Sequence, residues 1–150
     1  MDLFKMFAVD PQRITAGAWH VFTDTTDEIV QEAEIGDRAA VLLASIDNPA
    51  YEHALMQKIR GVKTRKGGGE ISQEEDNRLT GELVAAHIVL DWRNWVLGEP
   101  PKEIPIPYSK DKVLEIWTSL QWVKLRRKLS AMSGNDDAYR AIQQEAVLKN

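Results

Sequence analysis

The chain has 150 residues and contains no cysteine. The absence of thiols excludes disulfide bonds, thiolate metal sites and cysteine nucleophiles. Histidine is also scarce, and no two of His20, His53 and His87 have the spacing of a metal-binding pair. His87 and Asp91 are four residues apart and could share a metal ion on a helix, but two ligands do not make a site. We therefore expect no bound metal and no other cofactor.

Sequence signatures of catalysis are missing as well. There is no Gly-x-Ser-x-Gly elbow that would present a serine nucleophile. Gly67-Gly68-Gly69 lacks the Gly-Lys-Ser/Thr ending of a phosphate-binding loop, and three consecutive glycines favour a flexible surface loop instead. We expect no enzymatic activity and no catalytic residues.

Long apolar runs are absent too. No stretch approaches the ~20 apolar residues that a helix needs to cross a bilayer. The first eleven residues carry one lysine and a short apolar patch, which differs from a secretory signal. Together with the lack of cysteine, these absences favour a cytoplasmic protein with no membrane partner.

Charge is present but unevenly distributed. The chain holds 19 basic and 23 acidic residues, and a net charge of −4 excludes a strongly basic nucleic-acid coat. Residues 24–37 contain six acids and no base, whereas bases gather in residues 58–66 and 124–128. The basic clusters could neutralise phosphates, complement helix ends, or pair with the acidic segment of another copy. Because acids outnumber bases overall, nucleic acid is the less expected partner.

The first 36 residues predict a β-hairpin. Residues 17–23 are aromatic and β-branched, as in a short strand, and residues 24–27 have the composition of a turn. Residues 28–35 then fit a returning strand or, alternatively, the start of a helix.

From residue 37 onward the apolar spacing indicates helices. Residues 40–44 fit one face of a short helix. Asn48 and Pro49 predict the cap and first residue of a second helix, to about Val62. The capping box that begins at Ser72 predicts the longest helix, to about Leu97, whose wide apolar surface indicates a central buried position.

The last third of the chain also predicts helices. Four prolines within residues 98–107 predict a stiff, extended connector. Ser109 caps the next helix, a break is expected near residues 118–119, and further helices follow to about Met132 and beyond Asp136. The predicted fold is therefore mainly α: about five helices with a short N-terminal β-hairpin. Residues 1–36 form the hairpin segment and residues 37–150 the helical body of a single domain.

Five tryptophans are many for a chain of this length. Trp92, Trp95 and Trp117 lie on predicted helix faces and are expected in the core. Trp19 and Trp122 are less clearly placed, and an exposed tryptophan is a frequent anchor of a protein interface. The candidate partner-binding residues are therefore these two aromatic and five basic side chains: Trp19, Trp122, Arg60, Arg65, Lys66, Arg126 and Arg127.

Four motifs, in order, resemble the tail assembly chaperones of long-tailed (siphovirus-type) bacteriophages and prophages. Gly17-Ala18-Trp19-His20-Val21 is similar to the family's Gly-x-Trp-x-Val strand, and Asn48-Pro49-Ala50-Tyr51 to its Asn-Pro-x-Tyr helix start. Asp91-Trp92 resembles its Asp-Trp-x-Gly/Asn segment, and Ile104 to Ser109 its Pro-x-Pro-Tyr-Ser/Thr cap. Two features depart from the family pattern: Trp95 replaces a small or aliphatic residue, and residues 97–103 are longer than the usual turn.

The resemblance implies an assembly role without catalytic residues. Chaperones of this family coat the long tape measure protein in multiple copies, keep it soluble and help to recruit tail tube protein subunits. The implied partners are therefore tape measure protein, tail tube protein and further copies of the chain. The implied location is the cytoplasm of the bacterial host, with no place in the mature virion. A small helical nucleic-acid-binding regulator that uses residues 58–66 remains the alternative.

Overall fold

The computed structural model describes residues 1–23, 28–65 and 71–141. The predicted turn at residues 24–27 and the glycine loop at residues 67–69 lie outside these ranges. The α-helices of the described residues are α1 (Leu3–Phe7), α2 (Pro11–Ala16), α3 (Pro49–Arg65), α4 (Gln73–His87), α5 (Lys110–Thr118) and α6 (Val123–Ser133). The strands are β1 (Ala18–Val21), β2 (Glu28–Val30), β3 (Ala40–Leu43), β4 (Val89–Arg93), β5 (Val96–Leu97) and β6 (Ile104–Pro105).

The fold is mixed α/β, and the prediction of a mainly helical fold is wrong. Strands β1 to β4 form an antiparallel sheet in the order β2-β1-β3-β4. The predicted hairpin is present, with Trp19 opposite Val30, but it is only half of this sheet. The other half, β3 and β4, lies in the part of the chain for which helices were predicted.

Two short apolar segments account for the error. Ala40–Leu43 is a nearly fully buried strand, and a short buried apolar run cannot be distinguished from helix by its periodicity. The long helix α4 ends at His87 rather than near Leu97, and the chain continues as β4. The amide of Ala44 donates to the carbonyl of Ile88 at 2.9 Å, so pairing with β3 takes over where the helix stops.

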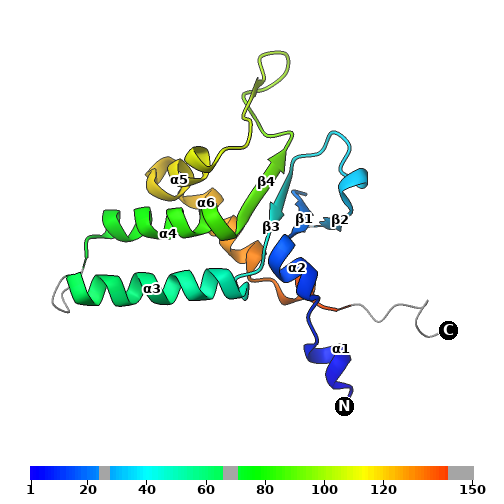
Figure 1. Ribbon diagram of the computed structural model, residues 1–150. Helices are drawn as coiled ribbons and strands as arrows, with labels where there is room; N and C mark the ends of the chain where they lie inside the picture. The colour runs from blue at the N-terminus through cyan, green and yellow to red at the C-terminus, as the bar shows by residue number, and fades with distance from the viewer. Residues whose placement is uncertain (24–27, 66–70, 142–150) are drawn as a thin grey trace.

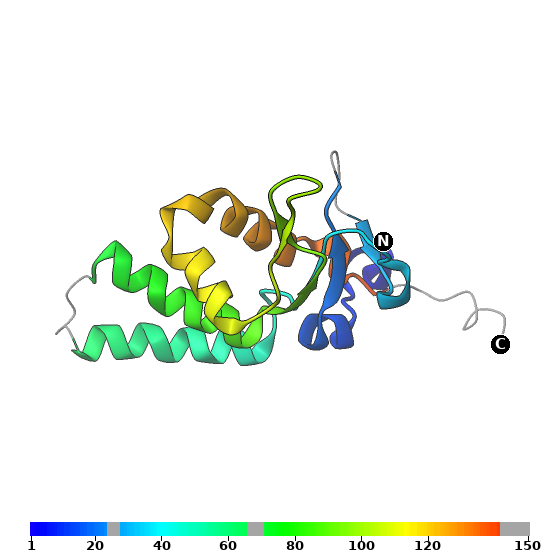
Figure 2. The same cartoon turned by 90° about the horizontal axis from the view of Figure 1, so that it is seen from above.

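Helices cover the sheet at its β4 side (Figure 1). In Figure 2, α3 and α4 lie side by side and extend away from the sheet, with α5 beside α4 and α6 beside α5. At Gly81, a Cβ atom would lie 2.8 Å from Cβ of Trp117, so the missing side chain lets α4 and α5 approach closely. No helix within the described ranges is long and apolar enough to cross a bilayer.

Helix starts follow the sequence prediction closely. Asn48 caps α3 by accepting a hydrogen bond from the amide of Ala50 at 3.2 Å. Ser72 and Ser109 cap α4 and α5 by accepting from the amides three residues later. The predicted break at residues 118–119 is present, because α5 ends at Thr118 and a 3-10 turn, Leu120–Trp122, precedes α6.

The end of the described chain packs against its beginning. A 3-10 turn, Asp136–Tyr139, stands where the last helix was predicted, and residues 142–150 of that prediction lie outside the described residues. Tyr139 is 2% exposed, and its carbonyl accepts from the amide of Asp10 at 2.8 Å. Val9 and Arg140 form a β-bridge, which fixes the segment that follows α1.

Candidate functional site: an apolar pocket beside a projecting arm

An apolar pocket of about 320 Å³ opens where β4 ends. The residues after β4 contribute one side of the pocket, and α5 with the start of α6 contributes the other. The side chains that line it include Phe22, Trp95, Leu97, Ile116, Trp122 and Leu125. A concave surface with this composition favours apolar side chains as ligands.

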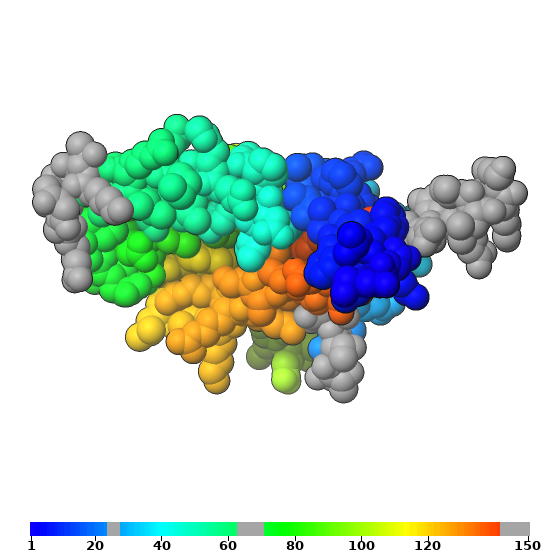
Figure 3. Space-filling model, turned by 90° about the horizontal axis from the view of Figure 1, so that it is seen from below, coloured from blue at the N-terminus to red at the C-terminus, as the bar shows by residue number. Residues whose placement is uncertain are grey.

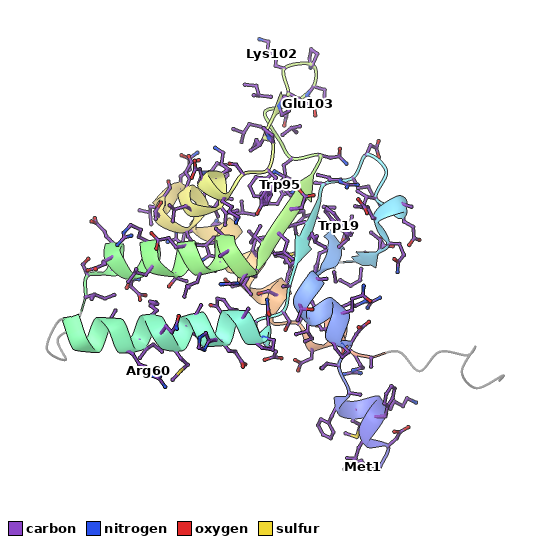
Figure 4. All side chains as sticks on the ribbon, in the orientation of Figure 1. Met1, Trp19, Arg60, Trp95, Lys102 and Glu103 are labelled. Carbon is purple, nitrogen blue, oxygen red and sulfur yellow. The ribbon has the colours of Figure 1, made fainter. Side chains whose placement is uncertain are left out.

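Two stacked tryptophans support the wall of the pocket. The rings of Trp92 and Trp95 lie parallel within 3°, with centroids 4.1 Å apart. The indole N–H of Trp92 donates to the carbonyl of Ile106 at 2.8 Å, and that of Trp95 to the carbonyl of Ala40 at 3.1 Å. Phe22 meets Trp95 edge-on at 5.8 Å. Because both indoles are fixed at their only polar atom, this wall is preformed. Figure 4 shows Trp95 between α5 and β4.

Tyr108 holds the chain on its return to α5. Its ring centroid lies 5.0 Å from that of Trp92, and its hydroxyl donates to the carbonyl of Val89 at 2.8 Å. Burial, together with the charge of Asp91, raises the pKa of the Tyr108 phenol above its ordinary value. The hydroxyl therefore stays protonated at neutral pH and remains a hydrogen-bond donor.

Residues 96–105 form a two-stranded arm that projects from the molecule, as Figures 1 and 4 show, with Lys102 and Glu103 near its tip. In this arm β5 pairs with β6, and Leu97 lies opposite Ile104. The predicted stiff connector is thus a strand pair, because the proline-rich segment returns along β5. The arm leaves Leu97 43% exposed and Ile104 64% exposed, so it adds apolar surface at the pocket.

Asn94 sets the turn between β4 and the arm. Its φ of 62° is in the left-handed region, which asparagine adopts more easily than most residues. Its side-chain amide donates to the carbonyls of Gly36 and Arg38 at 3.0 and 2.8 Å. These bonds tie the turn to the loop before β3 and fix where the arm begins.

Charged groups are few at the pocket. Lys112 lines it, and its ammonium group bonds to Glu115 at 2.7 Å. Within the described ranges, no three histidine, aspartate or glutamate side chains lie close enough together to hold a metal ion. His87 and Asp91 do not share a helix, since His87 ends α4 and Asp91 belongs to β4. The chemistry that this pocket offers is apolar binding.

The two tryptophans predicted as partner anchors lie in different places. Trp122 lines the pocket and is partly exposed. Trp19 is only 9% exposed in β1, and the guanidinium of Arg93 lies 5.0 Å from its ring centroid. Four other residues that line the pocket were not predicted as binding residues, because their apolar side chains could equally have belonged to the core: Phe22, Leu97, Ile116 and Leu125.

The predicted basic residues do not form one surface with the pocket. Arg60 lies on the exposed side of α3, and Arg65 is the last residue of that helix. Lys66 falls outside the described residues. Arg126 donates to the carbonyls of Ile116 and Ser119 at 3.2 and 2.9 Å, so it closes the end of α5. Arg127 is exposed on α6.

Charges in the basic segment 58–66 and in the acidic segment 24–37 have partners within the chain. Lys58 bonds to Asp76 at 2.8 Å across α3 and α4. From the acidic segment, Glu28 pairs with Arg38 at 3.0 Å and Glu32 pairs with Arg93. These internal pairs reduce the charge left for nucleic acid or for another copy.

The fold and pocket define a mixed α/β protein with an apolar pocket and a projecting arm. The profile of the YdaY prophage protein family matches residues 46–150, and the chain belongs to this family. It is therefore a prophage protein. No curated protein and no solved structure matches the chain. The matched region contains α3 to α6, the arm and most of the pocket, whereas Phe22 and α1 precede it.

Proposed function

We propose that this prophage protein is a tail assembly chaperone whose pocket binds apolar helical segments of the tape measure protein. The observation that carries the proposal is the apolar pocket beside an arm with exposed apolar side chains. An amphipathic helix presents apolar side chains at intervals of three and four residues, and such side chains fill grooves of this kind.

A preformed pocket suits a chaperone of a long helical client. The Trp92–Trp95 stack needs no rearrangement to receive a ligand, so binding costs less conformational entropy. Many copies could then cover successive apolar turns of one client. Tail tube subunits would displace the chaperone as they close around the tape measure protein.

Co-expression with the tape measure protein of the same prophage tests this function. The wild-type chain is expected to keep the client soluble and to elute with it at several copies per client. Leu97→Asp places a charge at the pocket without disturbing a buried residue and is expected to lose the complex. Leu120→Asp is the matched control, because Leu120 is 80% exposed and does not line the pocket.

Two results would contradict the proposal. One is a client that stays insoluble while the wild-type chain elutes alone. The other is a Leu97→Asp variant that forms the complex as well as the Leu120→Asp variant does.

The proposed location is the cytoplasm of the host, with no place in the finished virion. Mass spectrometry of purified tails is expected to detect tape measure and tube proteins but not this chain. Its presence in stoichiometric amounts would identify it as a structural component instead.

A further inference from the structure

The first helix exposes large apolar side chains that contact little else. Helix α1 has no buried residue. Its segment leaves five large apolar side chains between 46% and 93% exposed: Met1, Leu3, Phe4, Met6 and Phe7. Figure 3 shows this segment, in dark blue, at the surface of the face that is seen from below. Single exposed apolar residues are ordinary, but contiguous ones mark interaction sites.

Helix α1 cannot reach the pocket of its own chain. The carbonyl of Ala8 accepts from the amide of Ala141 at 2.9 Å, and Val9 bridges to Arg140. These contacts anchor α1 at one end of the molecule. Figure 4 shows Met1 at this end and the arm residues Lys102 and Glu103 at the opposite end.

We propose that α1 of one copy docks into the apolar pocket of a second copy. An aromatic side chain buries about 150–250 Å², so the exposed parts of Phe4 and Phe7, together with those of Met1, Leu3 and Met6, can bury on the order of 500 Å². With a similar area from the pocket and arm, the contact reaches roughly 1,000 Å², the lower bound for a specific protein interface.

Charge is complementary between the two surfaces as well. The α1 segment carries Lys5 and Asp2 beside its apolar side chains. The acceptor surface carries exposed Glu99 and Glu103 on the arm and Lys112 at the pocket. Lys5 of the donor segment can therefore meet the carboxylates of the arm, while the apolar side chains of α1 face the pocket.

This contact joins two different surfaces, so every added copy leaves one α1 and one pocket available. Such contacts produce rings or open chains of copies. The inference rests on the proposed function only in one consequence: if the pocket also receives the client, then the client and α1 compete. Self-association itself requires no client.

Sizing with light scattering, without any client, tests the docking. The donor variant carries Phe4→Asp and Phe7→Asp, both at exposed positions, and keeps its pocket. The acceptor variant carries Leu97→Asp and keeps α1. Each variant alone is expected to be monomeric at concentrations where wild type and the Leu120→Asp control form oligomers. An equimolar mixture of the two variants is expected to give a 1:1 dimer that does not grow, since only one junction can form.

A peptide of residues 1–9 gives a second measurement. It contains no tryptophan, so quenching or enhancement of protein fluorescence reports its binding near Trp95 and Trp122. The peptide is expected to bind the donor variant, to bind the acceptor variant at least tenfold more weakly, and to dissociate wild-type oligomers.

Several outcomes would overturn the docking of α1. They are a monomeric wild type, a donor variant that still forms oligomers, a mixture that stays monomeric, or a peptide that binds both variants equally. Because no client is present, these outcomes leave the chaperone function untouched. A failed client pull-down with an intact dimer in the mixture would instead contradict only the chaperone function.

Discussion

The hydroxyl of Tyr139 lies 3.1 Å from Nε2 of His20 and donates a hydrogen bond to the carbonyl of Leu43 at 2.8 Å. One side chain from the end of the described chain thus joins the neighbouring strands β1 and β3. The same segment bridges to Val9. Residues 139–141 therefore secure both the sheet and the base of α1.

Tyr139→Phe is expected to destabilise the fold by about 1–3 kcal/mol, because buried polar partners lose the hydroxyl that satisfies them. Urea unfolding followed by tryptophan fluorescence measures the change. Tyr51→Phe, at a half-buried position on α3, is the reference substitution. Equal unfolding midpoints for the two variants would show that the Tyr139 hydroxyl contributes no more to stability than the Tyr51 hydroxyl does.

Stability is expected to fall at alkaline pH. Burial raises the pKa of the Tyr139 phenol above its ordinary value of 10.0. The unfolded chain therefore loses this proton first. The contribution is fully present below about pH 10 and declines as the pH rises further, by up to about 1.4 kcal/mol per pH unit. Tyr139→Phe is expected to flatten this decline, and an unchanged slope would exclude Tyr139 as its source.

Gly81→Ala tests the close approach of α4 and α5. The added Cβ would lie 2.8 Å from Cβ of Trp117 and 2.9 Å from Cδ1 of Leu114. We expect a loss of about 1–3 kcal/mol from overpacking. Gly61→Ala on α3 is the matched control, since its Cβ would meet nothing within 4 Å, and it is expected to stabilise the helix by up to ~1 kcal/mol. A stabilised Gly81→Ala would contradict this packing.

Substitutions of Asn94 distinguish two contributions to the stability of the turn before the arm, namely its left-handed backbone and its side-chain hydrogen bonds. Asn94→Gly keeps the left-handed backbone accessible but loses the two side-chain hydrogen bonds. Asn94→Ala loses both advantages and is expected to be less stable than Asn94→Gly by about 1 kcal/mol. Thermal unfolding gives the order of the three proteins. An alanine variant equal to the wild type would mean that the turn does not need Asn94.

Arg126 and Arg127 are adjacent in sequence but differ in role. Arg126→Ala removes the donor that closes the end of α5 and is expected to cost about 1–3 kcal/mol. Arg127→Ala, at an exposed position, is expected to stay within about 0.5 kcal/mol of wild type. Thermal melts check both. The nucleic-acid alternative rests on residues 58–66, so it would gain support if Arg60→Ala weakened DNA binding with a steep salt dependence.

Helix caps were the most predictable part of this fold. Asn48, Ser72 and Ser109 act through their own side chains on amides two or three residues away, so local sequence is enough. Strand β3 was not predictable in this way. Its residues face neighbours on both sides and become a strand only because β1 and β4 pair with them.

The pocket was only partly foreseen. The excess of tryptophan pointed to Trp122, which does line it. Trp92 and Trp95 were expected on one helix face, whereas they lie on a strand and the turn after it, where their rings stack. Next to the pairing of β5 with β6, the amide of Ile106 donates a hydrogen bond to the carbonyl of Trp95. These two residues are eleven apart in the sequence, and no local pattern predicts their contact.

The opposite placement of α1 and the pocket gives any assembly built from their contact a direction. In an open chain of copies, one end offers a vacant pocket and the other end offers an unengaged α1. Copies would then add to the two ends at different rates, and a different ligand would block each end. Because each junction repeats the last, nothing in the contact itself limits the number of copies in an open chain.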